Sequence, residues 1–385
     1  TGNGFTEILK ADGTVWVTGN KDILDTCIGG RVEDENTMNE NTTNVENNNL
    51  DNIININAKD RSIQQVKISE TEYLTDIIKI SAGANHVLAL TQNGEIYAFG
   101  KNGAGQLGIA NNEKTNYATK VTGEGGSSNL KRIVDISAGE NGSTAINEFG
   151  WVFVWGNGSN GEFGNGGTTS SNTPVKTVIN KGISASIGTG HVAIQGQNGK
   201  LYTWGRNDNG QLGTGNTTNN LVVGKIADGI TDISASGNEI IVKDIDRKVY
   251  GTGQNTNGEL GIEGNTNITT LTEIALPNTT NVKYIKAGKT NTTLMLSDGT
   301  VWSTGIGTNG ELGNGNNDNS STFVKGMTFV EDENRADTGP APTDGDNTID
   351  NSEDNNIDVL TSHVSPLTSV LTIGRNTGGL NTAVV

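Results

Sequence analysis

A segment of about fifty residues recurs along this chain of 385 residues. The copies begin at Thr1, Ser81, Ser137, Ser186, Ser234 and Lys286. In all six copies a turn position, which is glycine in five copies and Arg247 in the fifth, precedes a second glycine by six residues. A frame kept this strictly restricts the chain to a repeat architecture, in which each copy builds one supersecondary unit.

Each copy reads as a β-hairpin. Four copies place Asp-Gly or Asn-Gly between two short apolar runs, at Asp12-Gly13, Asn93-Gly94, Asn198-Gly199 and Asp298-Gly299. These dipeptides tolerate positive φ at both turn positions, which favours a tight hairpin. The strand after the turn carries an aromatic side chain in every copy (Trp16, Tyr97, Phe153, Tyr202, Tyr250 and Trp302). This strand has little polar face, so we expect it to be covered on both sides by neighbouring sheets.

A glycine-rich loop with one apolar residue ends most copies. Its polar position is Gln106, Glu162, Gln211, Glu259 or Glu311 in successive copies. We expect these side chains to satisfy backbone groups of their own loops. One acid per repeat cannot supply the paired carboxyl groups that act on one substrate.

The pattern resembles the repeat of the regulator of chromosome condensation family over residues 1–27, 81–313 and 361–381. The resemblance implies an all-β fold, a seven-bladed β-propeller that closes on itself and so protects its sheet edges. The seventh copy, within residues 362–380, is degenerate and contains Pro366, which cannot donate a ladder hydrogen bond. The prediction is a single propeller over residues 1–385 with a degenerate seventh blade.

Two acidic inserts interrupt the spacing of the copies. Residues 28–70 hold eight Asp or Glu against four Lys or Arg, and residues 314–360 hold eleven against two. In a seven-membered ring both inserts would emerge in the sector where the first and last blades meet. They are either a recognition surface or solvated loops that tolerate length.

Composition removes several classes of function. The formal net charge of −17 argues against nucleic acid as a partner, because binding phosphates needs clustered Lys and Arg. No apolar run long enough to span a bilayer occurs and no signal-like sequence opens the chain, so we expect no membrane insertion. Cys27 is the single cysteine, which excludes an intrachain disulfide and a thiolate metal site.

Metal and catalytic sites have little support in the sequence. His86 and His191 occupy the same repeat position and His363 lies near it in the degenerate copy, so the histidines should be far apart and structural. Asp344, Asp346, Asp350 and Glu353 resemble a calcium loop, although Pro342 stands where its first ligand belongs. We therefore predict no catalytic residue and no cofactor, with calcium at these four acids as the one metal hypothesis.

The leading functional hypothesis is a protein-binding scaffold and not an enzyme. Low cysteine content, acidity and the Asn, Thr and Gly bias favour an extracellular or cell-surface module of a bacterium. The alternative is a structural, self-associating unit of a larger surface protein. The family resemblance also implies two specific roles, guanine-nucleotide exchange with chromatin binding, or a secreted propeller that inhibits β-lactamases. Fold alone does not choose between them.

Overall fold

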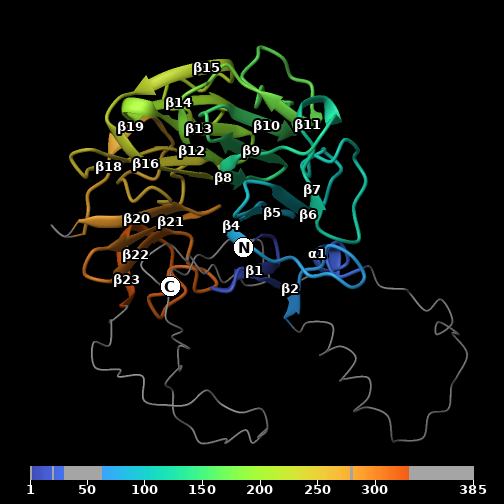
Figure 1. Cartoon of the computed structure of the whole chain (residues 1–385). Coiled ribbons are helices and arrows are strands. Elements are labelled where there is room, and N and C mark those ends of the chain that lie inside the picture. Colours follow the sequence, from blue (N-terminus) through green and yellow to red (C-terminus); the bar gives the residue numbers. More distant parts are fainter. Residues whose placement is uncertain (1, 20, 30–62, 278–280, 329–385) are drawn as a thin grey trace, which may run out of the picture.

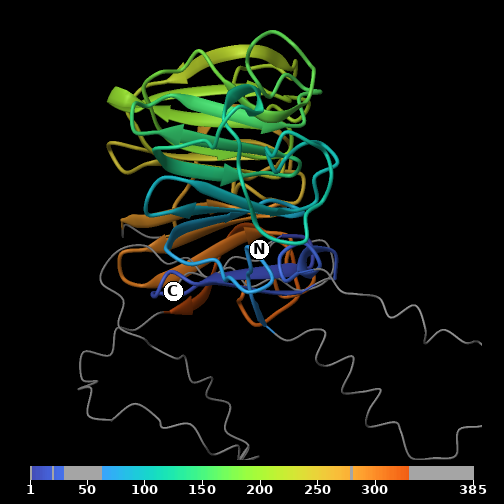
Figure 2. The same ribbon diagram turned by 45° about the vertical axis from the view of Figure 1, so that its right-hand side comes forward.

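The structure is a computed structural model that describes residues 2–19, 21–29, 63–277 and 281–328. These residues form six antiparallel sheets that follow one another in chain order. In Figure 1 the colours run from the blue first sheet through green and yellow to the orange sixth sheet. Figure 2 shows neighbouring sheets stacked face against face, which confirms an all-β propeller architecture.

The first sheet has three strands and each of the other five has four. The first comprises β1 (Phe5–Leu9), β2 (Val15–Gly19) and β3 (Gln64–Gln65). The next three comprise β4 (Ile77–Ala82), β5 (His86–Thr91), β6 (Ile96–Gly100) and β7 (Thr119–Lys120); β8 (Ile133–Ala138), β9 (Gly142–Asn147), β10 (Val152–Gly156) and β11 (Ser171–Lys176); and β12 (Gly182–Ile187), β13 (His191–Gly196), β14 (Lys200–Gly205) and β15 (Asn220–Ala227). The last two comprise β16 (Ile230–Ser236), β17 (Glu239–Asp244), β18 (Val249–Gly253) and β19 (Ile268–Glu273); and β20 (Val282–Ala287), β21 (Asn291–Leu296), β22 (Thr300–Gly305) and β23 (Ser320–Thr328). The short helix α1 (Lys21–Leu24) and two 3₁₀ turns (Glu124–Gly126 and Gln197–Gly199) complete the described elements.

The hydrophobic core lies between the sheets. Five clusters of buried side chains each join two neighbouring sheets, with Phe99, Trp155 and Trp204 as their largest members. The expectation that the strand after each hairpin turn is covered on both sides is therefore confirmed for β6, β10, β14 and β18, whereas each of the first and sixth sheets shares a cluster with one neighbour among the described residues. Cys27 is fully buried in the first of these clusters, where it packs as a small apolar residue.

The hairpins form where the sequence predicts them, but their turn geometry differs from the expectation. The glycines adopt positive φ, whereas among the preceding residues only Asn198 does so. Asp12 instead accepts hydrogen bonds from the Thr14 amide (2.9 Å) and hydroxyl (2.6 Å), and this side-chain turn keeps its own φ negative. In the fifth copy Arg247 itself adopts φ of 67°.

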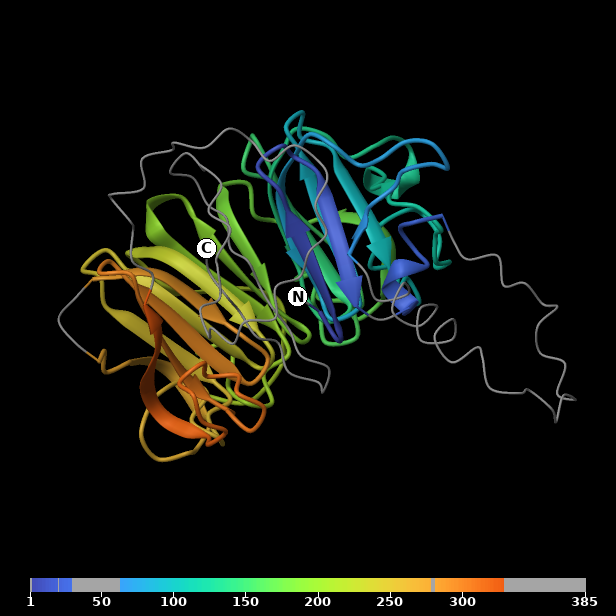
Figure 3. The ribbon, with the colours of Figure 1, turned by 90° about the horizontal axis from the view of Figure 1, so that it is seen from below.

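Seven blades were predicted, and this number is wrong: the described residues form six. Each clear sequence copy contributes the hairpin of one sheet, and there are six clear copies. The proposed seventh copy lies at residues 361–381, outside the described residues. In the four-stranded sheets we call the first strand, which lies nearest the centre of the ring, the inner strand. The strands of the first sheet correspond to the second, third and fourth strands of the others, so its described part has no inner strand. Figure 3 views the first and sixth sheets from below.

Parts of both acidic inserts belong to the sheets. Residues 320–328 form β23, the outer strand of the sixth sheet, and β3 pairs with β2 of the first sheet. Val66 is also buried in the first core cluster. The remaining insert residues, 30–62 and 329–360, lie outside the described part of the chain. Among the described residues, no helix has the length and apolar character needed to cross a bilayer.

The inner strands β4, β8, β12, β16 and β20 are joined by one repeated hydrogen bond. The serine hydroxyl of one inner strand accepts the backbone N–H of the next, at distances of 2.8 to 3.3 Å. The serines are Ser81, Ser137, Ser186 and Ser234. Lys286 occupies the equivalent position in β20 and has no hydroxyl to continue the series. These bonds fix the angle between sheets at the centre of the ring.

Candidate functional site

One side of the ring, which we call the loop face, carries two kinds of connection. They are the turns between first and second strands and the long loops between third and fourth strands. We call the second glycine of the repeat frame the closing glycine. In the second to sixth copies the residue after it donates its backbone N–H to the adjacent turn, as Arg206 does to the Gly190 carbonyl (2.8 Å). Gly205 has φ of 99°, and a Cβ there would lie 2.4 Å from that carbonyl oxygen, so only glycine fits. The same bond follows Gly100, Gly156, Gly253 and Gly305.

The long loops are held by their own polar side chains, as the sequence predicts. In the second to sixth copies the Gln or Glu accepts a hydrogen bond from the backbone N–H two residues earlier, at 2.7 to 2.9 Å. Asparagines that sequence reasoning did not single out add a second support. Asn102, Asn207 and Asn255 each accept the N–H of the buried leucine of their loop. The loop face is therefore rigid before any ligand arrives.

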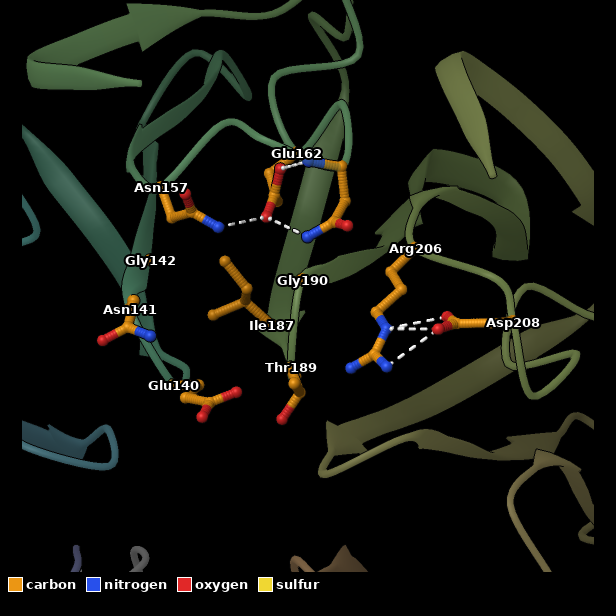
Figure 4. Close-up of a pocket in the computed structure, with 12 residues that line it drawn as sticks. Glu140, Asn141, Gly142, Asn157, Glu162, Ile187, Thr189, Gly190, Arg206 and Asp208 are labelled. Atoms are coloured by element: carbon orange, nitrogen blue, oxygen red, sulfur yellow. Dashed lines mark hydrogen bonds and ion pairs between the residues drawn. The ribbon is translucent and has the colours of Figure 1, made fainter. Parts of the chain in front are cut away.

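A polar pocket of about 320 Å³ opens on this face between the third and fourth sheets. Two turns and two loops supply its walls, as Figure 4 shows. Glu140 and Asn141 come from the β8–β9 turn, and Thr189 comes from the β12–β13 turn. Glu162 and Arg206 come from the loops that follow β10 and β14. We call this cavity the loop-face pocket.

Charge in the loop-face pocket is fixed by a paired arginine and two different carboxylates. Arg206 holds Asp208 through Nε at 2.7 and 2.9 Å and through Nη2 at 2.8 Å. This bond raises the pKa of Arg206 and lowers the pKa of Asp208, so both stay charged. Burial raises the pKa of Glu162, whose two oxygens accept bonds from Asn157 and Asn160. The Glu140 carboxylate makes no hydrogen bond or ion pair with the described residues.

The loop-face pocket adjoins the centre of the ring. A second cavity of about 190 Å³ lies between the ends of the inner strands and shares Glu140, Ile187, Gly188 and Thr189 with it. A ligand that enters the loop-face pocket can therefore extend into this second cavity.

The structure places His86 in the second sheet and His191 in the fourth, so the expectation that these two histidines lie apart is confirmed. His86 and His191 are both fully buried, and burial lowers their pKa to about 3 and about 4. His86 Nε2 lies 2.8 Å from the Ser143 hydroxyl, but that hydroxyl also donates to the Gln106 carbonyl. Nδ1 of His86 has no partner in the described structure, so no acid orients the ring as in a catalytic triad. His363 lies outside the described residues.

The calcium hypothesis is not tested by the structure. Asp344, Asp346, Asp350 and Glu353 all lie outside the described residues. Within residues 2–19, 21–29, 63–277 and 281–328, no three His, Cys, Asp or Glu side chains form a group that could hold a metal ion.

The residues of the loop-face pocket escaped the sequence analysis because they do not repeat. Arg206 follows the closing glycine, where other copies carry Lys101, Asn157, Gln254 and Ile306. Glu140 and Thr189 stand at a turn position that is Ala84 in the second copy. The sequence signal that could have found them is variation at fixed positions of the repeat. Repeated residues build the blades, whereas residues that vary at the same position make the loops of one blade differ from those of another.

Comparison with known proteins identifies the family of the chain. A family model described as the RCC1-like domain matches residues 56–380. The X-linked retinitis pigmentosa GTPase regulator of human is 34% identical over 28% of this chain and 10% of its own length. The ultraviolet-B receptor UVR8 of Arabidopsis thaliana is 35% identical over 26% of this chain and 21% of its own length. This chain thus spans a small part of the curated relatives that it matches.

Solved structures show the same fold. Yeast RCC1 (Prp20), in a structure bound to Kap60, has a TM-score of 0.67 at 19% identity, over 85% of this chain and 74% of that one. Human WBSCR16 has a TM-score of 0.59 at 19% identity, over 68% of each chain. With the repeat, the six stacked sheets and the family match over most of its length, the chain belongs to the RCC1-like domain family.

Proposed function

We propose that this chain is a non-enzymatic protein-binding module that recognises its partner with the loop face. The observation that carries the proposal is the half-buried Glu140 carboxylate, which shares the pocket with Arg206 but makes no hydrogen bond or ion pair with the described residues. Such a group, beside the Arg206–Asp208 pair, is preorganised to accept a donor at little entropic cost. The pocket holds three acids against one arginine, which favours a lysine or arginine side chain of the partner.

Support for a binding role also comes from related structures. Yeast RCC1 has been solved bound to Kap60, and a study of Prp20p concerns its binding to Gsp1p and histones. For this chain, the net charge of −17 disfavours chromatin, because a nucleosome surface is itself acidic along its DNA. Among the proposed functions, nucleotide exchange on a small GTPase therefore ranks third, after protein binding and self-association. An extracellular or cell-surface location remains part of the proposal, on composition alone.

Display of genomic fragments tests the binding role. Fragments of the source organism's genome are displayed on phage and selected on the full chain, then on an E140K variant. We expect enriched fragments to lose most of their affinity for E140K, and to keep it for a K114A control, because Lys114 lies outside the pocket. Fragments that bind both variants equally would contradict the use of this pocket. Faster release of labelled GDP from a small GTPase would favour the exchange reading instead.

A further inference from the structure

The inner strands share a second repeated device on the opposite side of the ring. In each of the five four-stranded sheets the register shifts at the second residue of the inner strand. A β-bulge of this kind leaves one residue unpaired in the ladder and turns its side chain outward. The five residues are Ile78, Val134, Ile183, Thr231 and Lys283. We call this side of the ring the bulge face.

Three consecutive sheets present large apolar side chains at the bulge. Ile78, Val134 and Ile183 are 56%, 55% and 50% exposed. Their strands are neighbours, because β8 contacts both β4 and β12. The next two sheets carry polar residues at the same position. At the bulge position, apolar side chains are therefore confined to three neighbouring sheets, while Ile245 in the β17–β18 turn of the fifth sheet is a separate exposed apolar residue on this face.

Two further exposed residues extend this arc outward. Phe149, at the tip of the β9–β10 hairpin, is 59% exposed, and Val178, between β11 and β12, is 75% exposed. The hairpin tip lies against the segment that leads into β12, since the Gly182 amide donates to the Gly150 carbonyl at 2.9 Å. We define Ile78, Val134, Phe149, Val178 and Ile183 as the apolar crescent. Exposed apolar side chains gathered over neighbouring elements mark an interaction site more often than scattered ones do.

The border of the apolar crescent carries three cations beside the exposed carboxylates of Asp76 and Glu148, although the chain as a whole is acidic. Arg132 precedes the bulge of β8, pairs with Glu148 at 2.8 Å and lies 5.5 Å from the centre of the Phe149 ring. Lys131 and Lys181 are exposed and form no ion pair with the described residues. A partner that covers the crescent therefore meets cations at its edges. Its own complement is a set of carboxylates around apolar side chains.

We propose that the apolar crescent is a second docking surface, which binds a peptide segment of a partner protein that combines apolar and acidic side chains. This extends the proposed binding function to the face opposite the loop-face pocket. A second copy of the chain is a poor occupant for a symmetric contact, because it would bring Lys131, Arg132 and Lys181 toward their own copies. The acidic residues 329–360 of this chain have the right charge but few apolar side chains.

A random-peptide library displayed on phage and selected on the full chain tests the proposal. The same selection runs on a V134D/I183D variant and on a T231D control, which places the same charge on the polar arc of the same face. Melting temperatures confirm that both variants fold, since all three side chains are on the surface. Synthetic copies of the enriched peptides are then measured by fluorescence anisotropy.

We expect enriched peptides that carry both apolar and acidic residues. They should lose about tenfold or more in affinity with V134D/I183D, weaken with K181E, and stay within about twofold with T231D and with E140K. Binding that survives E140K separates this surface from the loop-face pocket, so either proposal can fail alone. Basic peptides, no enrichment, or equal affinity for V134D/I183D would overturn the proposal. The proposal would also be overturned if a synthetic 329–360 peptide bound more tightly than the selected peptides. It would likewise be overturned if the parent chain sedimented as a dimer and the V134D/I183D variant as a monomer.

Discussion

Replacing Trp204 by alanine tests whether the sheets are held together by large side chains at their interfaces. Trp204 is fully buried in the cluster that joins the third and fourth sheets. Its indole N–H donates to the Glu162 carbonyl at 2.7 Å. The substitution therefore removes both a large apolar body and a buried hydrogen bond across the interface.

The magnitude follows from these two losses. A tryptophan buries on the order of 200 Å², which at about 25 cal/mol per Å² is roughly 5 kcal/mol, part of which alanine retains. Loss of the hydrogen bond to Glu162 adds about 1 kcal/mol. Since the neighbouring sheets are fixed by backbone bonds and cannot close the cavity, we expect W204A to lower the free energy of unfolding by about 3 to 5 kcal/mol.

Urea unfolding followed by far-ultraviolet circular dichroism measures this cost. W204F should lose less than W204A, because it keeps most of the apolar volume. The matched control is W151A: Trp151 is partly exposed and packs under Lys176, whose Nζ lies 3.0 Å from the ring centre. W151A should cost at most about 1.5 kcal/mol. A cost below about 1 kcal/mol for W204A, or equal costs for W204A and W151A, would refute the packing argument.

Three further predictions concern single buried positions. Burial, with the Glu259 carboxylate nearby, raises the pKa of Glu239 well above 4.5, so Glu239 stays protonated in the fold while the unfolded chain ionises, and the free energy of unfolding should fall as pH rises above about 4.5. E239Q keeps the bond from Thr292, so in urea titrations it should be more stable than the parent at about pH 8 and equal to it at about pH 4. G205A should cost more than about 2 kcal/mol because its Cβ would clash with the Gly190 carbonyl, whereas G103A, which meets nothing within 4 Å, should be close to neutral in thermal melts. Burial raises the pKa of the Cys27 thiol, so iodoacetamide should label it only after unfolding; rapid labelling of the native chain would show that the first core cluster is open.

The sequence predicts the blades better than the sites. The frame of glycines, the hairpins and the buried aromatics recur, and each recurrence adds to the same prediction. The pattern also predicts that Gln106, Glu162 and their equivalents bond to the backbone of their own loops, since loops of one length need the same backbone partner. The blade number could not, because it rested on residues 361–381, where the repeat is degenerate.

The candidate sites depend on neighbours that no single copy contains. Glu140 and Arg206 belong to different sheets, and only the stacking of those sheets brings them to one pocket. The exposure of Ile78, Val134 and Ile183 depends on bulges, and at these positions the sequence looks like any apolar strand residue. Alternation predicts the face of a side chain only when the register is regular.

The most direct test of the central claim is hydrogen–deuterium exchange of the full chain with and without its tightest displayed genomic fragment. A binding module that uses the loop-face pocket should show slower exchange at residues 139–142, 188–190 and 206–210 when the fragment is bound, and no change in the E140K variant. Protection confined to the outer strands, or protection that E140K leaves intact, would contradict the account.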